Sequence, residues 1–397
     1  MAHALVRAAS PLLATPGATP PRKHMKIDGA DLDLSGLQVL PGLINAHDHL
    51  QFALFPRLGS GPYANATEWA RDIHHPERDP VRRHLLVPKH LRLIWGGLRN
   101  LAAGVTAVSH HDSYHPVFDE DFPVRVIKDC GWAHSLAFTP DVRERFVATG
   151  PNVPFVIHLG EGTDQSAAEE VFRLHELGAL DCRTVLVHAV GLTCEGWDLV
   201  RAAGASVVWC PRSNLFTLGR TIPSKILQSG IPIALGTDSS LTAEGDLLDE
   251  LDHIGEVTTR AALVTAAASR ILRLPPRPSD WIAASKFGAP PELVVIGGVI
   301  RLISPELASG LPPSLRREFH PLKIHTRPPV LVRWDIPQLL QETRQHLGPG
   351  PICLAGREVS GYFTTSTPGR CSIPHRHPRK RIVRRDSRAR DSDSTGQ

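Results

Sequence analysis

Apolar runs and amphipathic segments alternate through the second half of this 397-residue chain. Short apolar runs bounded by turn residues are typical of buried strands, whereas apolar positions repeated every three or four residues are typical of helices. The pattern predicts strands over residues 155–159, 184–188, 206–210 and 231–237. It predicts helices over residues 166–177, 195–203, 224–229 and 247–274. This alternation favours an α/β protein with βα repeats and a parallel sheet.

The first half is less regular. An apolar run over residues 38–50 is interrupted by Pro41-Gly42 and predicts the first buried strand. Further along, the pattern predicts a helix over 87–103, a strand over 105–109, a helix over Val124 to Asp129 and a strand over Trp132 to Phe138. Only about 16 residues then separate Phe138 from Phe155, which is too few for a helix, a strand and another helix.

Residues 51–87 are rich in Gly, Pro, Arg and His, with one brief helix near Thr67 to Asp72. Long loops of this kind are usually functional or disordered, and this one directly follows the first strand. We therefore expect it to form a lid. Near the C-terminus the pattern predicts a hairpin over 293–303, a Pro-rich linker over 305–330, a helix over 337–346 and a strand over 352–359.

The formal net charge of +4 arises from the C-terminal tail. Residues 370–397 contain nine Lys or Arg and three Asp, leaving 35 basic and 37 acidic residues in the rest of the chain. A basic run can contact nucleic acid, but such runs are usually solvated and disordered, so we do not expect a nucleic-acid partner. No apolar run reaches the roughly 18 residues of a membrane span.

The six cysteines are scattered without a C-x-x-C pair, which argues against a zinc knuckle or a disulfide framework. The N-terminus has no clear signal peptide. We therefore expect a cytoplasmic protein, and a homo-oligomer is compatible with the sequence.

Polar residues follow the ends of several predicted strands. His47 and His49, two residues apart in a strand, share one face, whereas Asp48 points the other way. The strand over 155–159 leads to His158 and Glu161, and two later strands end at His188 and Asp238. The carboxyl ends of parallel strands are where α/β enzymes build their sites. Three imidazoles and a carboxylate suit one divalent ion, zinc or alternatively iron. An isolated H-x-H or a single polar strand end carries little weight, but agreement at four strands indicates a metal site.

The first of these stretches, with Pro41, Gly42, Ile44, Asn45, His47 and His49, resembles the P-G-x-I-[ND]-x-H-x-H signature of the metal-dependent amidohydrolase superfamily. The H-x-x-E unit of His158 and Glu161 resembles the branch that includes cytosine, guanine and adenosylhomocysteine deaminases, triazine hydrolases and imidazolonepropionase. No lysine lies at a strand end between His110 and His158, so the carbamylated lysine of the two-metal branch has no candidate.

The resemblance implies a distorted (β/α)8-type TIM barrel over residues 41–280, and the short spacing between Phe138 and Phe155 indicates that one βα unit is missing or collapsed. It also implies a small, reduced β side domain formed by residues 28–40 with 290–360. Residues 1–27 are expected to be a poorly ordered N-terminus and 361–397 a basic, disordered tail.

The same resemblance implies site roles: one metal held by His47, His49, His158 and Asp238, with Glu161, His188 and Asp238 as catalytic groups. Asp238 would accept a proton from water, His188 would polarise the substrate, and Glu161 would carry a proton to the leaving nitrogen. Glu161 has a plainer interpretation as a carboxylate at the start of a helix. Ser213 and Asn214 resemble the P-x-S-N turn of this branch and, with His111, are expected to contact substrate. His111 belongs to a polar cluster with His110, Asp112 and His115 that could equally be an exposed loop.

The expected function is hydrolysis of a non-peptide C–N bond in a small molecule, a cyclic amide, amidine or aminated heterocycle. Deamination and ring opening both begin with attack of water on an sp² carbon, so the sequence does not separate them. The alternative is a non-catalytic relative that binds a ligand or metal without turnover.

Overall fold

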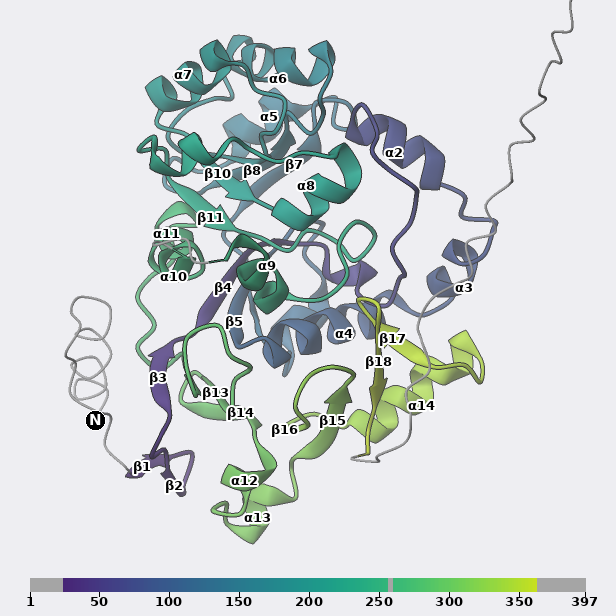
Figure 1. Ribbon diagram of the computed structural model, residues 1–397, viewed down its shortest axis with the longest axis vertical. Helices are drawn as coiled ribbons and strands as arrows, with labels where there is room; N and C mark the ends of the chain where they lie inside the picture. Colours follow the sequence, from purple (N-terminus) through teal and green to yellow (C-terminus); the bar gives the residue numbers. More distant parts are fainter. Residues whose placement is uncertain (1–23, 256–259, 363–397) are drawn as a thin grey trace, which may run out of the picture.

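The computed structural model describes residues 24–255 and 260–362. The predicted disorder of residues 1–23 and of the basic tail from 363 onward therefore falls outside the described chain. The described part consists of a parallel α/β portion and an antiparallel sheet, which occupy the upper and lower halves of Figure 1.

The parallel portion contains a three-stranded sheet and a five-stranded sheet. The first has the order β4 (Leu43–Asp48), β5 (Val105–His110), β6 (Arg125–Val126). The second has the order β11 (Ile233–Leu235), β10 (Ser206–Trp209), β9 (Thr184–His188), β8 (Phe155–Leu159), β7 (Gly131–Ser135). A parallel bridge between Asp48 and Asp238 connects the two sheets on the side of β4 and β11. This arrangement is a mixed α/β, barrel-like fold.

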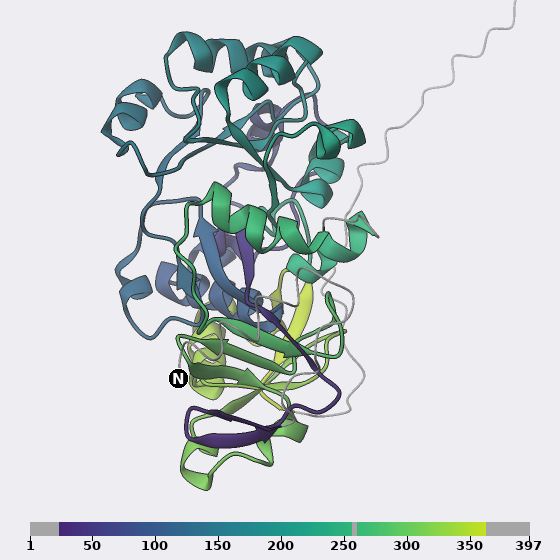
Figure 2. The ribbon, with the colours of Figure 1, turned by 90° about the vertical axis from the view of Figure 1, so that its left-hand side faces the viewer.

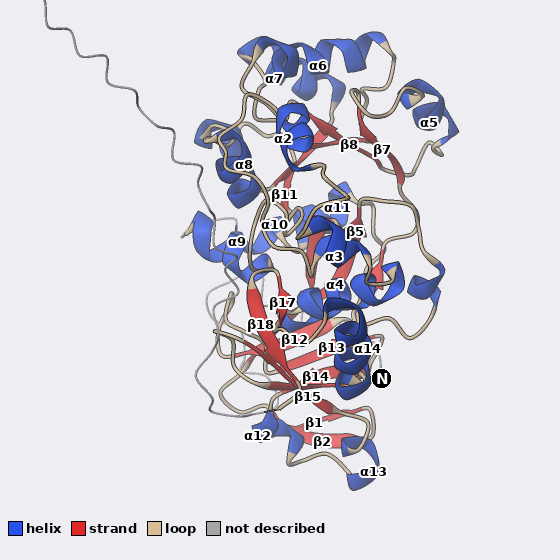
Figure 3. Cartoon of the chain, turned by 90° about the vertical axis from the view of Figure 1, so that its right-hand side faces the viewer, coloured by secondary structure: helices blue, strands red, loops and turns tan. Residues whose placement is uncertain are grey.

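Helices cover the outside of the parallel strands, as Figure 3 shows in blue. They are α2 (Ala66–Ile73), α3 (Val81–Leu85), α4 (Lys89–Ala102), α5 (Val142–Ala148), α6 (Gln165–Glu176), α7 (Cys194–Ala203), α8 (Pro211–Leu218), α9 (Leu247–Ile254), α10 (Arg260–Leu263) and α11 (Ala266–Ile271), with single-turn 3₁₀ segments at Leu50–Phe52, Pro116–Asp119 and Ser224–Gln228.

The antiparallel sheet lies below the parallel strands in Figure 2. Its eight strands have the order β17 (Ile352–Leu354), β18 (Arg357–Ser360), β15 (His320–Ile324), β16 (Val330–Val332), β14 (Val299–Ile303), β13 (Leu293–Ile296), β12 (Trp281–Ala284), β3 (Gln38–Pro41). Near it lie the hairpin β1 (His24–Ile27) and β2 (Ala30–Asp33), and the helices α12 (Pro305–Ala308), α13 (Pro313–Arg316) and α14 (Ile336–Leu347).

One hydrophobic cluster joins the two portions. It contains Leu43 and Leu186 of the parallel strands, Trp95 of α4 and Val294 of the antiparallel sheet, all almost completely buried. The indole N–H of Trp95 also donates to Thr343 of α14 at 2.8 Å. The antiparallel sheet is therefore packed directly against the helix that supports the first two parallel strands.

Three predicted segments are wrong. Residues 124–129 contain no helix, because Arg125–Val126 forms β6 and pairs with Ala107 and Val108 of β5. The expected Pro-rich linker over 305–330 contains α12, α13 and β15, since proline is well suited to the first turn of a helix and occupies it in both α12 and α13. Residues 24–27 of the expected disordered N-terminus form β1.

The gap between Phe138 and Phe155 holds the single helix α5. The shortened connections lie earlier in the chain, where β5, β6 and β7 follow one another with only the 3₁₀ turn at Pro116–Asp119 between them. No helix among the described residues has the length and apolar character that crossing a membrane requires.

Candidate metal centre

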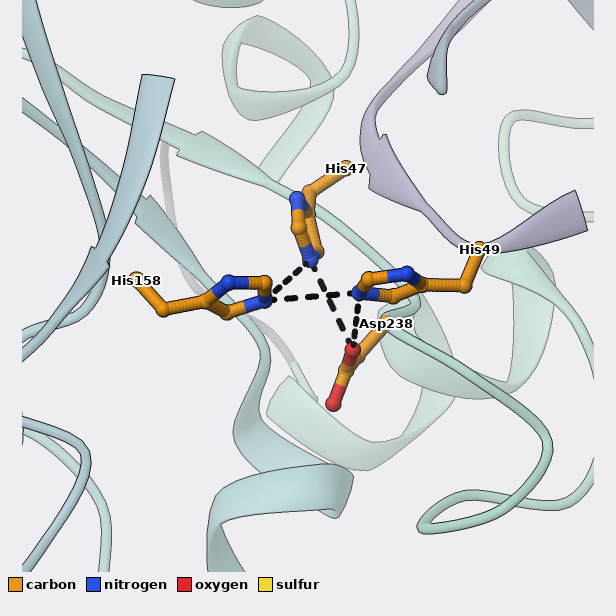
Figure 4. Close-up of side chains that lie close together, drawn as sticks. All are labelled: His47, His49, His158 and Asp238. Carbon is orange, nitrogen blue, oxygen red and sulfur yellow. Dashed lines mark hydrogen bonds and ion pairs between the residues drawn. The ribbon is translucent and has the colours of Figure 1, made fainter. Parts of the chain in front are cut away.

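Four side chains from three strand ends converge at one point, drawn in Figure 4. His47 and the following His49 come from β4, His158 comes from β8, and Asp238 follows β11. The Nε2 atom of His158 lies 3.2 Å from that of His47 and 3.3 Å from that of His49. Asp238 Oδ1 lies 3.5 Å from each of the Nε2 atoms of His47 and His49. We call these four residues the metal cluster.

The spacing of these atoms matches the shell of one small cation. Ligand atoms bonded at 2.0–2.1 Å in a tetrahedron lie about 3.3–3.4 Å from one another, which is the separation observed here. The Nδ1 atom of His158 is 2.8 Å from the carbonyl oxygen of His134, so Nδ1–H donates there and the Nε2 lone pair faces the cluster. An imidazole lone pair directed at this point, beside two further imidazoles and a carboxylate, makes a donor set that fits a divalent ion.

The electrostatics of the cluster favour metal binding as well. Burial lowers the pKa of His47, and it lowers the pKa values of His49 and His158 well below their usual range. These imidazoles are therefore neutral at pH 7, the form that ligates metals. Burial alone would raise the pKa of Asp238, but its hydrogen bond with His47 and the nearby imidazoles lower that pKa well below its usual range. Asp238 is therefore ionised.

The backbone brings Asp238 to the cluster at close range. The amide N–H groups of Thr237 and Asp238 donate to the carbonyl oxygen of His47 at 3.0 and 3.1 Å. A Cβ atom on Gly236 would lie 2.8 Å from His47 Cβ, so this approach requires glycine. Asp238 itself has a φ of 56°, a left-handed conformation that costs energy in a non-glycine residue and is concentrated at functional sites.

Two further polar groups hold Asp238 Oδ2. The hydroxyl of Ser213 donates to it at 2.6 Å and the hydroxyl of Thr242 at 3.0 Å. These contacts leave Oδ1 directed at the imidazoles. Ser213 belongs to α8, and the segment expected to be a turn is thus the first part of a helix.

His188 and Glu161 lie beside the metal cluster. His188 Nε2 is 3.5 Å from Glu161 Oε1, while its Nδ1 donates to Asn214 Oδ1 at 2.7 Å. His188 is completely buried and has a φ of 75°, a second strained position at the site. Burial raises the pKa of Glu161 to about 7. A carboxyl with that pKa can hold or release a proton at neutral pH.

The polar residues at the end of β5, His110, His111 and Asp112, make different kinds of contact. His111 is buried, packs its ring against that of His158 at a centroid distance of 4.4 Å, and places Nε2 3.1 Å from the carbonyl oxygen of Ala133. Asp112 instead forms an ion pair with Lys89 at 2.8 Å, and His110 accepts the N–H of Leu50. Of this group, therefore, His111 is the member in ring contact with three residues of the metal cluster, His47, His49 and His158.

The segment expected to be a lid contacts the loop that carries Glu161. The N–H of Ala66 donates to the carbonyl oxygen of Glu161 at 2.9 Å, and Asn65 forms an antiparallel bridge with Gly162. Helix α2 begins at this contact, because the side chain of Asn65 accepts the N–H of Glu68 and caps the helix.

Sequence reasoning missed several residues that contact the site. Thr242 holds Asp238, the ring of His134 lies 4.9 Å from that of His158, and Glu170 accepts the N–H of Gly160 at 2.7 Å. His134 had a usable signal, since it is a histidine within a predicted strand. Thr242 and Glu170 lie in segments without such a signal, and their roles depend on how the chain folds back.

Comparisons with known proteins find similar sequences and structures. No family model matches the chain. Among curated proteins, it is 33% identical to a 5-methylthioadenosine/S-adenosylhomocysteine deaminase of Moorella thermoacetica over 58% of this chain and 63% of the relative. It is 26% identical to the protein of that name from Syntrophobacter fumaroxidans over 61% of this chain and 66% of the relative. The chain thus aligns with just under two thirds of the length of these relatives.

Solved structures share the fold at lower identity. A zinc-bound adenosine deaminase of Xanthomonas campestris matches with a TM-score of 0.55 and 18% identity, covering 77% of this chain and 85% of that one. A zinc complex of atrazine chlorohydrolase from Arthrobacter aurescens matches with a TM-score of 0.57 and 16% identity, covering 79% and 88%. The fold that the chain shares with these structures is a barrel-like arrangement of α/β sheets. The chain is thus similar in sequence to curated deaminases over part of their length, and it shares its fold with an adenosine deaminase, an atrazine chlorohydrolase and a guanine deaminase.

Proposed function

We propose that the protein hydrolyses a non-peptide C–N bond of an aminated heterocycle, releasing ammonia. The observation that carries this proposal is the placement of Glu161 and His188 beside the metal cluster, with the pKa of Glu161 raised to about 7 by burial. A metal-binding protein without turnover has no need for a protonatable carboxyl at that position.

His47, His49, His158 and Asp238 would hold one divalent ion, and zinc is our first candidate because two of the structural neighbours are described with zinc. When bound, such an ion supplies Lewis acidity and lowers the pKa of water from 15.7 towards about 7.

The residues of the chain would then move the protons. Asp238, ionised and held at Oδ2 by Ser213 and Thr242, accepts a proton from the attacking water. Glu161, about half protonated near pH 7, donates a proton to the substrate nitrogen. A bond forms between the water oxygen and the ring carbon, the C–N bond breaks, and the amino group leaves as ammonia.

His188 and His111 would orient the substrate. Since Asn214 accepts the Nδ1–H of His188, the Nε2 atom of that ring stays free to face the reacting carbon or Glu161. No partner for His188 Nε2 meets hydrogen-bond criteria among the described residues, which leaves it available to substrate. The segment around Ala66 is proposed to act as a lid, on the basis of its hydrogen bonds to the Glu161 loop.

We further propose that the two parallel sheets are arcs of one distorted (β/α)8-type barrel, with its shortened βα connections between β5 and β7. The barrel would extend over residues 41–280, and the antiparallel sheet, with residues 28–40 and 290–360, would be the side domain. Strand β12 (Trp281–Ala284) pairs with β3 and so belongs to the antiparallel sheet. The C-terminal part of the side domain would therefore begin at residue 281 instead of 290.

The relatives suggest which substrates to test first. They are named as deaminases of 5-methylthioadenosine, S-adenosylhomocysteine and 5'-deoxyadenosine. Zinc-loaded protein is mixed with these nucleosides, with guanine and with cyclic amides, and ammonia release and ring opening are followed separately. We expect ammonia from at least one amino-heterocycle. Ring opening of a cyclic amide without ammonia would contradict deamination, and no turnover of any compound by metal-loaded protein would contradict the hydrolase proposal.

A further inference from the structure

Helix α8 carries Ser213 and Asn214, which contact Asp238 and His188. Its N-cap residue, however, does not cap the helix with a side-chain hydrogen bond. The N-cap residue Cys210 makes no side-chain hydrogen bond to the helix, and Pro211 has no N–H. Arg212 is therefore the first residue of the helix with a free backbone donor. The next two residues are Ser213, bound to Asp238, and Asn214, bound to His188. A small shift at this helix start would move both contacts.

A glutamate from the following helix takes the place of the missing cap. Glu250 of α9 is 1% exposed, and its Oε2 accepts the backbone N–H of Arg212 at 3.2 Å. Its Oε1 lies 3.8 Å from the guanidinium of the same arginine. Burial raises the pKa of Glu250 to about 8, against the opposing charge of Arg212. Neutral or ionised, the carboxyl keeps an oxygen that can accept this N–H.

Helix α9 is itself fixed at its first turn by the antiparallel sheet. Asp246 and Asp249 form a capping box there. Arg327 donates to Asp246 at 2.6 Å, and Arg357 of β18 donates to Asp249 at 2.6 Å. We call these four residues the arginine cluster. Glu250 is the residue directly after Asp249, so the same turn carries the arginine contacts and the cap of α8.

We infer that Glu250 is a positioning residue, which accepts the N–H of Arg212 and thereby fixes the helix start from which Ser213 and Asn214 hold Asp238 and His188. The inference rests on the proposed function only in taking Asp238 as a metal ligand. Residues that support a ligand in this way usually change metal affinity 10- to 100-fold when removed.

Two substitutions distinguish the effect of the length of the Glu250 side chain from the effect of its ability to ionise. Glu250→Gln keeps the length of the side chain and an acceptor oxygen but cannot ionise, whereas Glu250→Asp can ionise but is one methylene too short. Zinc dissociation constants are measured by chelator competition, which requires no substrate. We expect the Asp variant to bind zinc about 10- to 100-fold more weakly than wild type, and the Gln variant to stay within about threefold of wild type, as the retained acceptor implies.

The matched control is Asp280→Asn. Asp280 is also a buried carboxylate, paired with Arg125 and remote from α8, so its loss tests whether general destabilisation weakens zinc binding. We expect no change in the zinc dissociation constant. Circular dichroism checks that each variant is folded. If the Asp variant does not fold, Arg357→Gln takes its place, because this partly exposed arginine holds α9 from outside.

The outcomes distinguish the inference from the proposed function. Wild-type protein that binds no divalent ion would overturn the proposed metal site. Wild type that binds zinc, with the Asp variant (or, in its place, Arg357→Gln) binding equally well, would overturn only the role of Glu250. A Gln variant that binds zinc as weakly as the Asp variant would also overturn it, since the ability of Glu250 to ionise, rather than the length of its side chain, would then be decisive.

Discussion

The metal cluster and the arginine cluster are both buried and polar, but their atoms are arranged in opposite ways. In the arginine cluster each carboxylate receives hydrogen bonds from guanidinium groups, and the hydrogen bond and charge of Arg357 outweigh burial and bring the pKa of Asp249 to about 2. In the metal cluster three imidazole Nε2 atoms and one carboxylate oxygen converge on one point with no cationic side chain among them. Backbone strain at His188 and Asp238 accompanies the metal site, whereas no member of the arginine cluster has a positive φ.

This difference separates groups that stabilise the fold from groups that serve a ligand. A paired cluster satisfies its own charges, so its loss should cost stability. The metal cluster has ligand atoms without a cationic side chain between them and strained backbone beside it, and the surrounding structure holds it in this form. Its ligand atoms gain their partner when a metal ion binds. Substitutions in the arginine cluster should therefore act mainly on stability, and on zinc binding only through helix α9, whereas substitutions at the metal site should act directly on metal binding and catalysis.

The largest expected effect is on catalysis. Glu161→Gln should lower kcat by about 10²- to 10⁴-fold, the usual contribution of a general acid, because the amide cannot donate and recover a proton. Zinc content should not change. Glu169→Gln, an exposed carboxylate in the helix that follows, is the control and should be as active as wild type. If the Glu161 variant keeps full activity, this residue has no catalytic role.

The protonation of Glu250 should be visible in the pH dependence of the free energy of unfolding. Its native pKa is about 8, compared with 4.5 in an ordinary setting, so the native state keeps a proton that the unfolded state releases. Where the native state binds more protons, stability falls as pH rises, here between about 4.5 and 8. The contribution is on the order of 3 to 5 kcal/mol at 1.36 kcal/mol per pKa unit. Urea unfolding at several pH values should show a steeper decline in wild type than in Glu250→Gln, and parallel curves would contradict the assignment.

Breaking the arginine cluster should cost stability with little direct effect on the reacting groups. Arg357→Gln removes hydrogen bonds to Asp249 and Asp246 but leaves Arg327 in place, so we expect the free energy of unfolding to fall by about 2 kcal/mol, below the cost of an isolated buried pair. The pH profile of kcat should keep its shape. A variant as stable as wild type in urea would show that the cluster does not stabilise the fold.

The smallest expected effect comes from the basic tail. Removing residues 370–397 should leave kcat/KM and zinc content unchanged, because the metal cluster lies wholly within the described chain. Loss of activity on truncation would favour a function that acts through the tail, such as nucleic-acid binding.

Much of the metal cluster could be predicted because strand ends are local features. The apolar runs before His47, His158, His188 and Asp238 mark buried strands, and parallel strands place their carboxyl ends together. Those runs agree with β4, β8, β9 and β11 to within a few residues.

The arginine cluster could not be predicted in this way. Arg327 and Arg357 reach Asp246 and Asp249 from residues about 80 to 110 positions away, and no periodicity links them. Likewise, β6 forms because Arg125–Val126 finds a partner in β5, which the local sequence does not indicate. The contacts that support the site are thus long-range, while the ligands themselves follow a local pattern.

The most direct test of the central claim is metal analysis of protein purified without chelator, with wild type beside His158→Ala and Asp238→Ala. We predict close to one divalent transition-metal ion per wild-type chain and a large loss of metal in both variants, each of which removes one of the four ligand atoms. Wild-type protein without near-stoichiometric metal, or variants that retain it fully, would contradict a metal site formed by His47, His49, His158 and Asp238.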